Sequence, residues 1–424
     1  MTEARIEHIV GRRVWDSRGR PTVEAEIFLD NGASGRAIAP AGASTGTHEA
    51  LELRDGGAAF GGLGVDRAVA NISGEIAAAL RSMPIADQRA VDERLIALDG
   101  TPNKARLGAN ATIAVSMAAL HAAAAAAREP LWRLLARGGP AALPMPMIQI
   151  FGGGAHAGRR VDIQDFMIIP TAAATFDQAL TMAACVYRAA GEIMAERGRL
   201  RGVADEGGWW PEFGSNAEAL ATLAFAIDRA GLVPGEEVGI AIDVAASQFY
   251  ERGRYRLAAD GIELDTEGLI ELLAEWCRRY PIVSVEDPVA EDDETGMVSF
   301  TTRVGGPIQI IGDDYLVTSA SRITAAASRG ACDAVLLKPN QAGTITETKA
   351  ALDAARAAGW RTVVSARSGE TEDVTIVHLA VGWNAGQLKV GSFARSERMA
   401  KWNEGLRIEA ALGAAASFAG WRCG

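Results

Sequence analysis

Hydrophobic and polar positions alternate near the start of the chain, as they do in strands. Residues 24–29 read Glu-Ala-Glu-Ile-Phe-Leu, an Asp-Asn-Gly turn follows at 30–32, and a second short alternating stretch covers 35–38. This pattern predicts a small antiparallel meander.

Helical periodicity follows a Gly/Ala/Ser/Thr loop at 42–46. Three long Ala/Leu-rich stretches carry it, over residues 65–81, 86–98 and 109–128. Apolar positions with this spacing predict helices that bury one face. Together with the meander they indicate an α+β domain over residues 1–140.

From Pro144 onward the pattern changes to short apolar runs separated by helix-length segments. Strands that alternate with helices predict β/α units and a largely parallel sheet. A closed β/α barrel needs about 250 residues, which residues 141–424 can supply. We therefore predict an α/β fold with a TIM-like barrel as the second domain.

Composition narrows the possible partners. A formal net charge of −11 repels polyanions, so we expect neither nucleic acid nor an anionic membrane as a partner. The N-terminus shows no apolar stretch after its basic residues, and residues 109–127 are Ala-rich but interrupted by polar side chains. We expect a cytoplasmic protein in which that segment is a buried helix.

Ionisable residues follow several of the apolar runs in the second half. Three runs end in acids, at Asp243, Glu286 and Asp313. Parallel strands of a barrel bring such ends to one face, where carboxylate oxygens suit Mg²⁺. A single acid after a strand can equally cap the next helix, but three in succession favour a metal site.

Two further runs end in lysine, although only five of the 42 basic residues are lysines. Unlike arginine, a lysine beside another cation or a metal can lose its proton and act as a base. We assign that role to Lys338. Lys389 would then bind the substrate carboxylate and help to keep Lys338 neutral.

Arg367 and Ser368 follow another strand-like run and precede a predicted helix start at residue 369. A guanidinium, a hydroxyl and helix N-terminal amides would together bind a phosphate.

A series of motifs in this order resembles the enolase family over nearly the whole chain. They include VWDSRGRPTVEAEI, GASTGTHEALELRDG, GGGAHAG, ADEGGW, VSVEDPVAEDD, IGDDYLVT, LLKPNQAGT, SARSGETED and LKVGSFARSERMAKWN. The resemblance implies an N-terminal capping domain, a barrel with an atypical beginning, and a homodimer or larger homo-oligomer. It also implies two Mg²⁺ ions and a small phosphorylated carboxylate as the substrate.

The resemblance also implies a role for each matching residue. The first metal would bind Asp243, Glu286 and Asp313, and the second would bind Ser44. Lys338 would be the base and Glu206 the acid that assists departure of the 3-hydroxyl. The remaining positions are Lys389 for the carboxylate, Arg367 and Ser368 for the phosphate, and His156 and Gln164 as pocket residues.

The sequence departs from the family near the reacting end of the substrate. Ala366 replaces a histidine, and Asp165 replaces a glutamate that works beside Glu206. Ala41 replaces a serine, and a Trp209-Trp-Pro-Glu-Phe segment replaces Phe-Ala-Pro-Asn. A shift near 1 Å can reduce a rate by about a hundredfold, so these changes bear directly on the choice of reaction.

Three functions fit these observations. The first is phosphopyruvate hydratase, which forms phosphoenolpyruvate from 2-phosphoglycerate. The second is an enolase-like carboxyphosphonoenolpyruvate synthase, whose nucleotide-activated phosphonoformate could use the room at Ala366. The third is a non-catalytic paralogue, which the intact Lys338 and Glu206 disfavour.

Overall fold

A computed structural model describes residues 3–42 and 46–421. Its N-terminal sheet is antiparallel, in the order β1-β2-β3, and consists of β1 (Ile6–Trp15), β2 (Pro21–Leu29) and β3 (Ser34–Ile38). The predicted meander is therefore confirmed. The first strand of the sheet, β1, was not anticipated from the alternating pattern.

Helices cover this sheet in the predicted order. The stretch expected as one helix over 65–81 is divided into α1 (Asp66–Asn71), a π-helical turn at Ile72–Ile76 and α2 (Ala77–Leu80). Three more helices complete the N-terminal part: α3 (Gln88–Asp99), α4 (Ala109–Ala127) and α5 (Leu131–Ala136).

Helix α4 packs against β2 and β3. A Cβ on Gly35 of β3 would lie 2.0 Å from the amide nitrogen of Ala122, so only glycine permits this approach of helix and sheet. Within the described part of the chain, α4 is also the one helix long and apolar enough to cross a membrane, but 78% of that window is buried in the protein. It is thus a core helix, as expected.

In the described second half, eight strands close into a barrel. In chain order they are β5 (Met145–Gly152), β6 (Asp165–Ile169), β7 (Gly239–Asp243), β11 (Ile282–Glu286), β12 (Gln309–Gly312), β13 (Ala334–Leu337), β14 (Arg361–Ser365) and β15 (Gly386–Ser392). Strand β6 is antiparallel to both of its neighbours, β5 and β7, whereas the other pairs are parallel. The barrel is confirmed, and this reversal is its atypical beginning.

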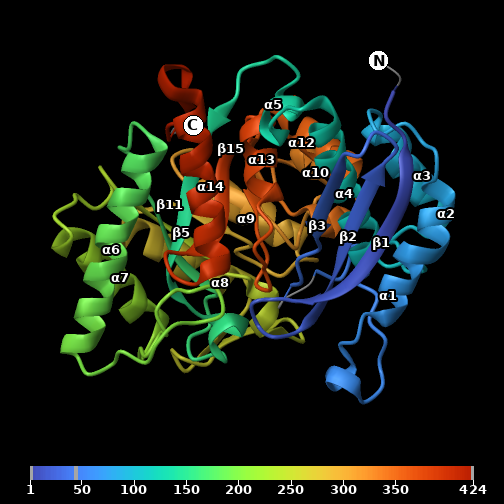
Figure 1. The fold of residues 1–424 in the computed structure, drawn as a ribbon. Helices are drawn as coiled ribbons and strands as arrows, with labels where there is room; N and C mark the ends of the chain where they lie inside the picture. Colours follow the sequence, from blue (N-terminus) through green and yellow to red (C-terminus); the bar gives the residue numbers. More distant parts are fainter. Residues whose placement is uncertain (1–2, 43–45, 422–424) are drawn as a thin grey trace.

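Helices surround the barrel. They are α6 (Phe176–Glu196), α7 (Asn216–Arg229), α8 (Thr266–Arg279), α9 (Glu294–Val304), α10 (Ala320–Arg329), α11 (Pro339–Ala342), α12 (Ile345–Ala357), α13 (Thr375–Gly382) and α14 (Ser396–Leu412). Short strands β8 (Tyr250–Glu251), β9 (Arg254–Leu257) and β10 (Ile262–Leu264) form a separate sheet, and β4 (Ala142–Leu143) pairs with β16 (Ser417–Phe418). Figure 1 shows the blue N-terminal sheet on the side of the molecule opposite α6 and α7.

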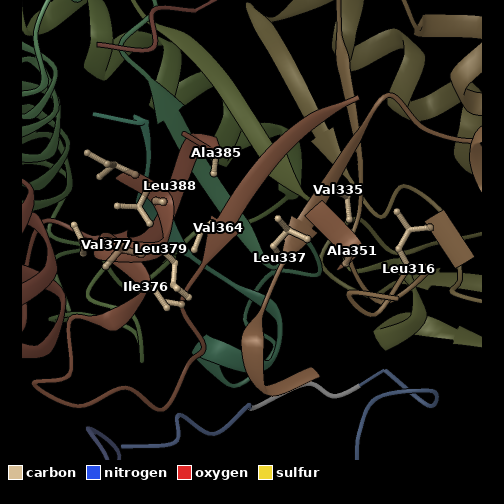
Figure 2. Packing of buried hydrophobic residues seen from close by; sticks show 14 of the residues in the cluster. Leu316, Val335, Leu337, Ala351, Val364, Ile376, Val377, Leu379, Ala385 and Leu388 are labelled. Atoms are coloured by element: carbon tan, nitrogen blue, oxygen red, sulfur yellow. The ribbon is translucent and has the colours of Figure 1, made fainter. Parts of the chain in front are cut away.

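Side chains of the barrel strands alternate between two apolar clusters. In β13, Ala334 and Leu336 belong to the cluster inside the barrel, together with methionines of β5 and β6. Val335 and Leu337 belong to the larger cluster between strands and helices, where Figure 2 shows them near Ala351 of α12. This period of two is what a closed sheet with packed faces requires.

Candidate active site

One cavity at the rim of the barrel is lined by most of the predicted site residues. These are His156, Gln164, Asp165, Glu206, Asp243, Lys338, Arg367, Ser368 and Lys389, and Ala366 lines the same cavity. Glu286 and Asp313 are buried beside it, and Ser44 lies outside the described residues. The structure therefore brings the described candidates together from seven barrel strands or their ends, from the 3-10 turn Gly154–Ala157 that carries His156, and from the loop between α6 and α7 that carries Glu206.

Strand direction explains why Asp165 reaches this rim. It is the first residue of β6, whereas Asp243 is the last residue of β7, and the antiparallel register places the two opposite each other. Glu286, the last residue of β11, pairs with Asp243 in the parallel register. Reversing β6 thus lets the beginning of one strand meet the ends of its neighbours.

The acids after the strands do not cap the next helices in the described structure. Helices α8, α9 and α10 take their N-terminal caps from Asp265, Asp293 and Ser319, each of which accepts a hydrogen bond from a first-turn amide. Capping therefore does not account for Asp243, Glu286 or Asp313.

Lys389 connects two of these acids. Its Nζ lies 2.9 Å from Asp243 Oδ2 and 2.9 Å from each carboxylate oxygen of Glu286. Burial alone would lower the pKa of Lys389, but Asp243 and Glu286 outweigh it and raise that pKa well above its ordinary value. Burial raises the pKa of Glu286, and the charge of Asp243 raises it further. Asp313 also raises the pKa of Glu286. The carboxylates of Asp243, Glu286 and Asp313 thus require compensating positive charge.

Lys338 differs from the expectation in its electrostatics. Its Nζ contacts Asp313 Oδ2. Burial would lower the pKa of Lys338, but the Asp313 carboxylate outweighs it and the pKa is raised. This direction is opposite to the one predicted for a base. The neighbouring cation that lowers this pKa is Arg367, not Lys389 as expected.

A metal site fits the donor set, although the closest grouping differs from the predicted triad. Oxygen atoms of Asp287, Asp313 and Asp314 lie within 4.8 Å of one another, as do ligand atoms of His156, Asp165 and Glu206. Buried carboxylates that lack sufficient positive charge, as the raised pKa of Glu286 indicates, suit a hard divalent cation such as Mg²⁺.

Asp287 was missed by sequence reasoning. It accepts hydrogen bonds from the amides of Asp313, at 2.9 Å, and Asp314, at 2.7 Å. Gln341, also missed, donates from Nε2 to Asp313 Oδ1 at 2.9 Å. Burial raises the pKa of Asp314 to about 8, and the charge of Asp313 contributes. The doubled acids in VED and GDD were the available signal for Asp287 and Asp314, whereas Gln341 lies outside both motifs.

His156 lies among the residues predicted to act on the leaving group. Its Nδ1 is 3.3 Å from Asp165 Oδ1, and its Nε2 is 3.7 Å from Glu206 Oε1 and 3.2 Å from Ser368 Oγ. Burial would lower the pKa of His156, but Glu206 and Asp165 outweigh it and raise that pKa. A protonated imidazole is therefore favoured between the two acids.

Asp165 is buried and only half satisfied. Gln149, which sequence reasoning missed, donates to Oδ1. Oδ2 has no hydrogen-bond partner among the described residues and lies 3.4 Å from Lys389 Nζ. Burial would raise the pKa of Asp165, but His156 and Lys389 lower it overall. The anionic form of Asp165 is thus favoured, with Lys389 as the cation nearest to its second oxygen.

The predicted phosphate clamp contains a carboxylate that the sequence did not reveal. Arg367 Nη1 is 2.9 Å from Glu49 Oε2, and Nη2 is 3.2 Å from Glu49 Oε1. The two side chains are only 3% and 7% exposed. Burial would lower the pKa of Arg367, but Glu49 outweighs it and raises that pKa. An anion of the protein itself therefore binds the guanidinium.

The predicted helix start at residue 369 is wrong. Helix α13 begins at Thr375, and residues 369–374 form a loop. Glu370 in this loop accepts a bond from the amide of Arg367, at 3.0 Å, and pairs with Lys401, at 2.9 Å. Asp373 accepts from the amide of Thr375 at 2.8 Å. Because α13 begins only at Thr375, and the amide of Thr375 already donates to Asp373, the predicted contribution of helix N-terminal amides to the clamp is not present.

Two of the departures from the family also contact the site. Ala41 exchanges two backbone hydrogen bonds with Gly369, at 2.9 and 2.8 Å, which need no serine side chain. Trp209 stacks on Tyr187 with ring centroids 4.7 Å apart, and the Tyr187 hydroxyl donates to the carbonyl of Gly207, at 2.9 Å. The tryptophan thus holds the segment that carries Glu206 against α6.

Comparisons with known proteins agree with this arrangement. A family profile described as "Enolase, N-terminal domain" matches residues 6–135, and one described as "Enolase, C-terminal TIM barrel domain" matches residues 140–423. The protein named Enolase 1 of Desulfitobacterium hafniense (strain Y51) is 51% identical over 419 residues, which cover 98% of this chain and 95% of that protein.

Proposed function

Because this chain belongs to the enolase family, we propose that it is a lyase, a phosphopyruvate hydratase that converts 2-phosphoglycerate to phosphoenolpyruvate and water. The observation that carries the proposal is the 51% identity to Enolase 1 over 98% of the chain. The cavity supports it, because one space is lined by a lysine, a glutamate and an arginine with a serine beside it.

The predicted residues divide the reaction among them, with Asp165 as the catalytic carboxylate that works beside Glu206 and Gln164 as a residue that binds the substrate. Arg367 and Ser368 bind the phosphate, and Lys389 binds the carboxylate. Lys338 removes the proton on the carbon next to the carboxylate, and Glu206 gives a proton to the departing 3-hydroxyl. His156, which lies between Asp165 and Glu206, holds the acid in position.

Mg²⁺ belongs to the proposal through the family and the donor set. Asp243, Glu286 and Asp313 would hold the first ion, and Ser44 a second. When bound, Mg²⁺ supplies positive charge for the carboxylate that gains negative charge as the proton leaves. Without its contact to Asp313, burial and Arg367 would lower the pKa of Lys338, while Glu286 and Asp314 would still raise it.

The test is a Mg²⁺-dependent assay with 2-phosphoglycerate, followed by the absorbance of the enol product. Turnover at ordinary enolase rates that stops on chelation with EDTA and returns with Mg²⁺ is the expected result. A second arm adds cytidylylated phosphonoformate. Turnover only in that arm would favour the carboxyphosphonoenolpyruvate synthase, which the comparisons do not support, and none in either arm would favour a non-catalytic paralogue.

Three further expectations remain part of the proposal. The chain divides into a capping domain over residues 1–140 and a barrel over 141–424, acts as a homodimer or larger homo-oligomer, and works in the cytoplasm without nucleic acid or membrane partners. Light scattering after size exclusion measures the oligomer size directly.

A further inference from the structure

Arg398 of α14 is a buried cation that contacts main-chain carbonyls. Its side chain is fully buried. Nη1 donates to the carbonyl of Arg367, at 2.7 Å, and to that of Val390, at 2.9 Å, and Nη2 donates to the carbonyl of Ser368, at 2.5 Å. All three acceptor residues line the cavity: Arg367 and Ser368 follow β14, and Val390 lies within β15.

The charge of Arg398 is compensated mainly by these carbonyls. Glu397 Oε1 lies 3.6 Å from Arg398 Nε, but this oxygen already accepts a 2.9 Å hydrogen bond from Arg395. Arg398 Nε has no hydrogen-bond partner within the described chain. Removing a cation from water costs several kcal/mol, and an apolar side chain of similar volume often stabilises such a position as well or better. Packing alone therefore does not explain an arginine here.

The three carbonyls belong to segments with different predicted tasks. Arg367 and Ser368, just after β14, would bind the phosphate. Val390 in β15 follows Lys389, which would bind the carboxylate. The Arg398 guanidinium is planar and holds its donors at fixed angles. Its hydrogen bonds therefore join the two segments through one rigid group. Gly391, at φ +110°, brings its backbone close to this group, since an added Cβ would lie 3.2 Å from Arg398 Cδ.

We propose that Arg398 is a positioning residue that sets the spacing between the phosphate-binding and carboxylate-binding parts of the site. The inference rests on the proposed function, because that function assigns the two parts. It implies that Arg398 affects ligands carrying both groups more than ligands carrying one. A residue that only stabilised the fold would affect both kinds of ligand alike.

The experiment compares two ligands in Mg²⁺ buffer by calorimetry: inorganic phosphate and 2-phosphoglycolate, which carries a phosphate and a carboxylate and does not react. The variants are Arg398→Lys, which keeps the charge on one nitrogen, and Arg398→Gln, which is neutral. Lys104→Met is the matched control. Lys104 is also buried and pairs with Glu347 at 2.9 Å, but it does not line the cavity.

We expect either Arg398 variant to bind 2-phosphoglycolate about tenfold more weakly or worse than the parent, because ångström-scale misplacement has effects of this order. The affinity for inorganic phosphate should fall by less than about threefold. Lys104→Met should lower the melting temperature and leave both affinities within about twofold of the parent.

Equal losses for the two ligands, or no loss for either, would overturn the proposal. So would a parent-like Arg398→Lys beside an impaired Arg398→Gln, because charge alone would then suffice. If one variant does not unfold cooperatively, the other decides the result. Failure of the proposed function is seen separately, as absence of 2-phosphoglycerate turnover in the parent enzyme, while the binding comparison can still be made.

Discussion

Replacing Glu49 by glutamine tests whether the protein's own carboxylate competes with the substrate phosphate for Arg367. The pair is bidentate, at 2.9 and 3.2 Å, and nearly inaccessible to solvent. Removing one partner of such a buried pair costs about 3–5 kcal/mol, because the remaining charge is uncompensated. Glutamine keeps one oxygen acceptor, so we expect the lower end, about 3 kcal/mol.

This free energy can be converted into measurable shifts. An unfolding entropy of about 2.1 cal/mol/K per residue gives roughly 0.9 kcal/mol/K for 424 residues. A loss of about 3 kcal/mol then lowers the melting temperature by about 3 °C. Bound phosphate supplies the missing anion, so inorganic phosphate should bind Glu49→Gln about tenfold more tightly or better, which needs only half of that free energy.

Scanning calorimetry with and without phosphate, together with titration calorimetry, measures both effects. Glu347→Gln is the control, because it breaks the pair with buried Lys104 away from the clamp and should destabilise without changing phosphate affinity. If Glu49→Gln melts like the parent, or binds phosphate more weakly, Glu49 does not compete for the guanidinium and the reasoning is wrong.

Further predictions concern pH and catalysis. Burial lowers the pKa of His378 to about 4, so the free energy of unfolding falls by about 3 kcal/mol as the pH drops from about 6.5 to about 4, where only the unfolded state is protonated. Urea unfolding at pH 7.5 and pH 4.5 should show most of this loss in the parent but not in His378→Asn. Lys338→Ala should abolish exchange of the substrate α-proton with solvent deuterium, whereas Glu206→Gln should retain exchange and form no product. NMR measures the exchange, and exchange at the parent rate in Lys338→Ala would contradict the role of Lys338 as the base. Ala366→His combined with Asp165→Glu should raise 2-phosphoglycerate turnover by about tenfold or more, equivalent to roughly 1.4 kcal/mol; an efficient parent with no gain in the double variant would mean that both departures are neutral.

The sequence predicted those parts of the site that depend on strand periodicity. A parallel strand that ends in an acid places that acid at a known edge, and the structure shows Asp243 and Glu286 in register there. The reversal of β6 has no signature in its five residues, because either direction buries the same apolar side chains. That position of Asp165 came from the family resemblance alone.

Contacts between distant segments were not predictable in this way. Glu49 and Arg367 are 318 residues apart, and nothing local to Glu49 shows that it meets a guanidinium. Arg398 binds carbonyls, which every residue carries, so no sequence pattern identifies its partners. The predicted helix start at 369 is wrong because Glu370 pairs with Lys401 and accepts a hydrogen bond from the amide of Arg367, and does not cap a helix.

The bonds between the N-terminal sheet and the 369–374 loop have a consequence for synthesis of the chain. The amide of Ile38, the last residue of β3, donates to Asp373 across 335 residues, and Ala41 pairs with Gly369 nearby. At about 5–20 residues per second, a ribosome needs roughly 20–70 s to make the intervening chain. The N-terminal domain therefore leaves the ribosome before Asp373 and Gly369 have been made. Ile38 and Ala41 lack these hydrogen-bond partners until translation is nearly complete.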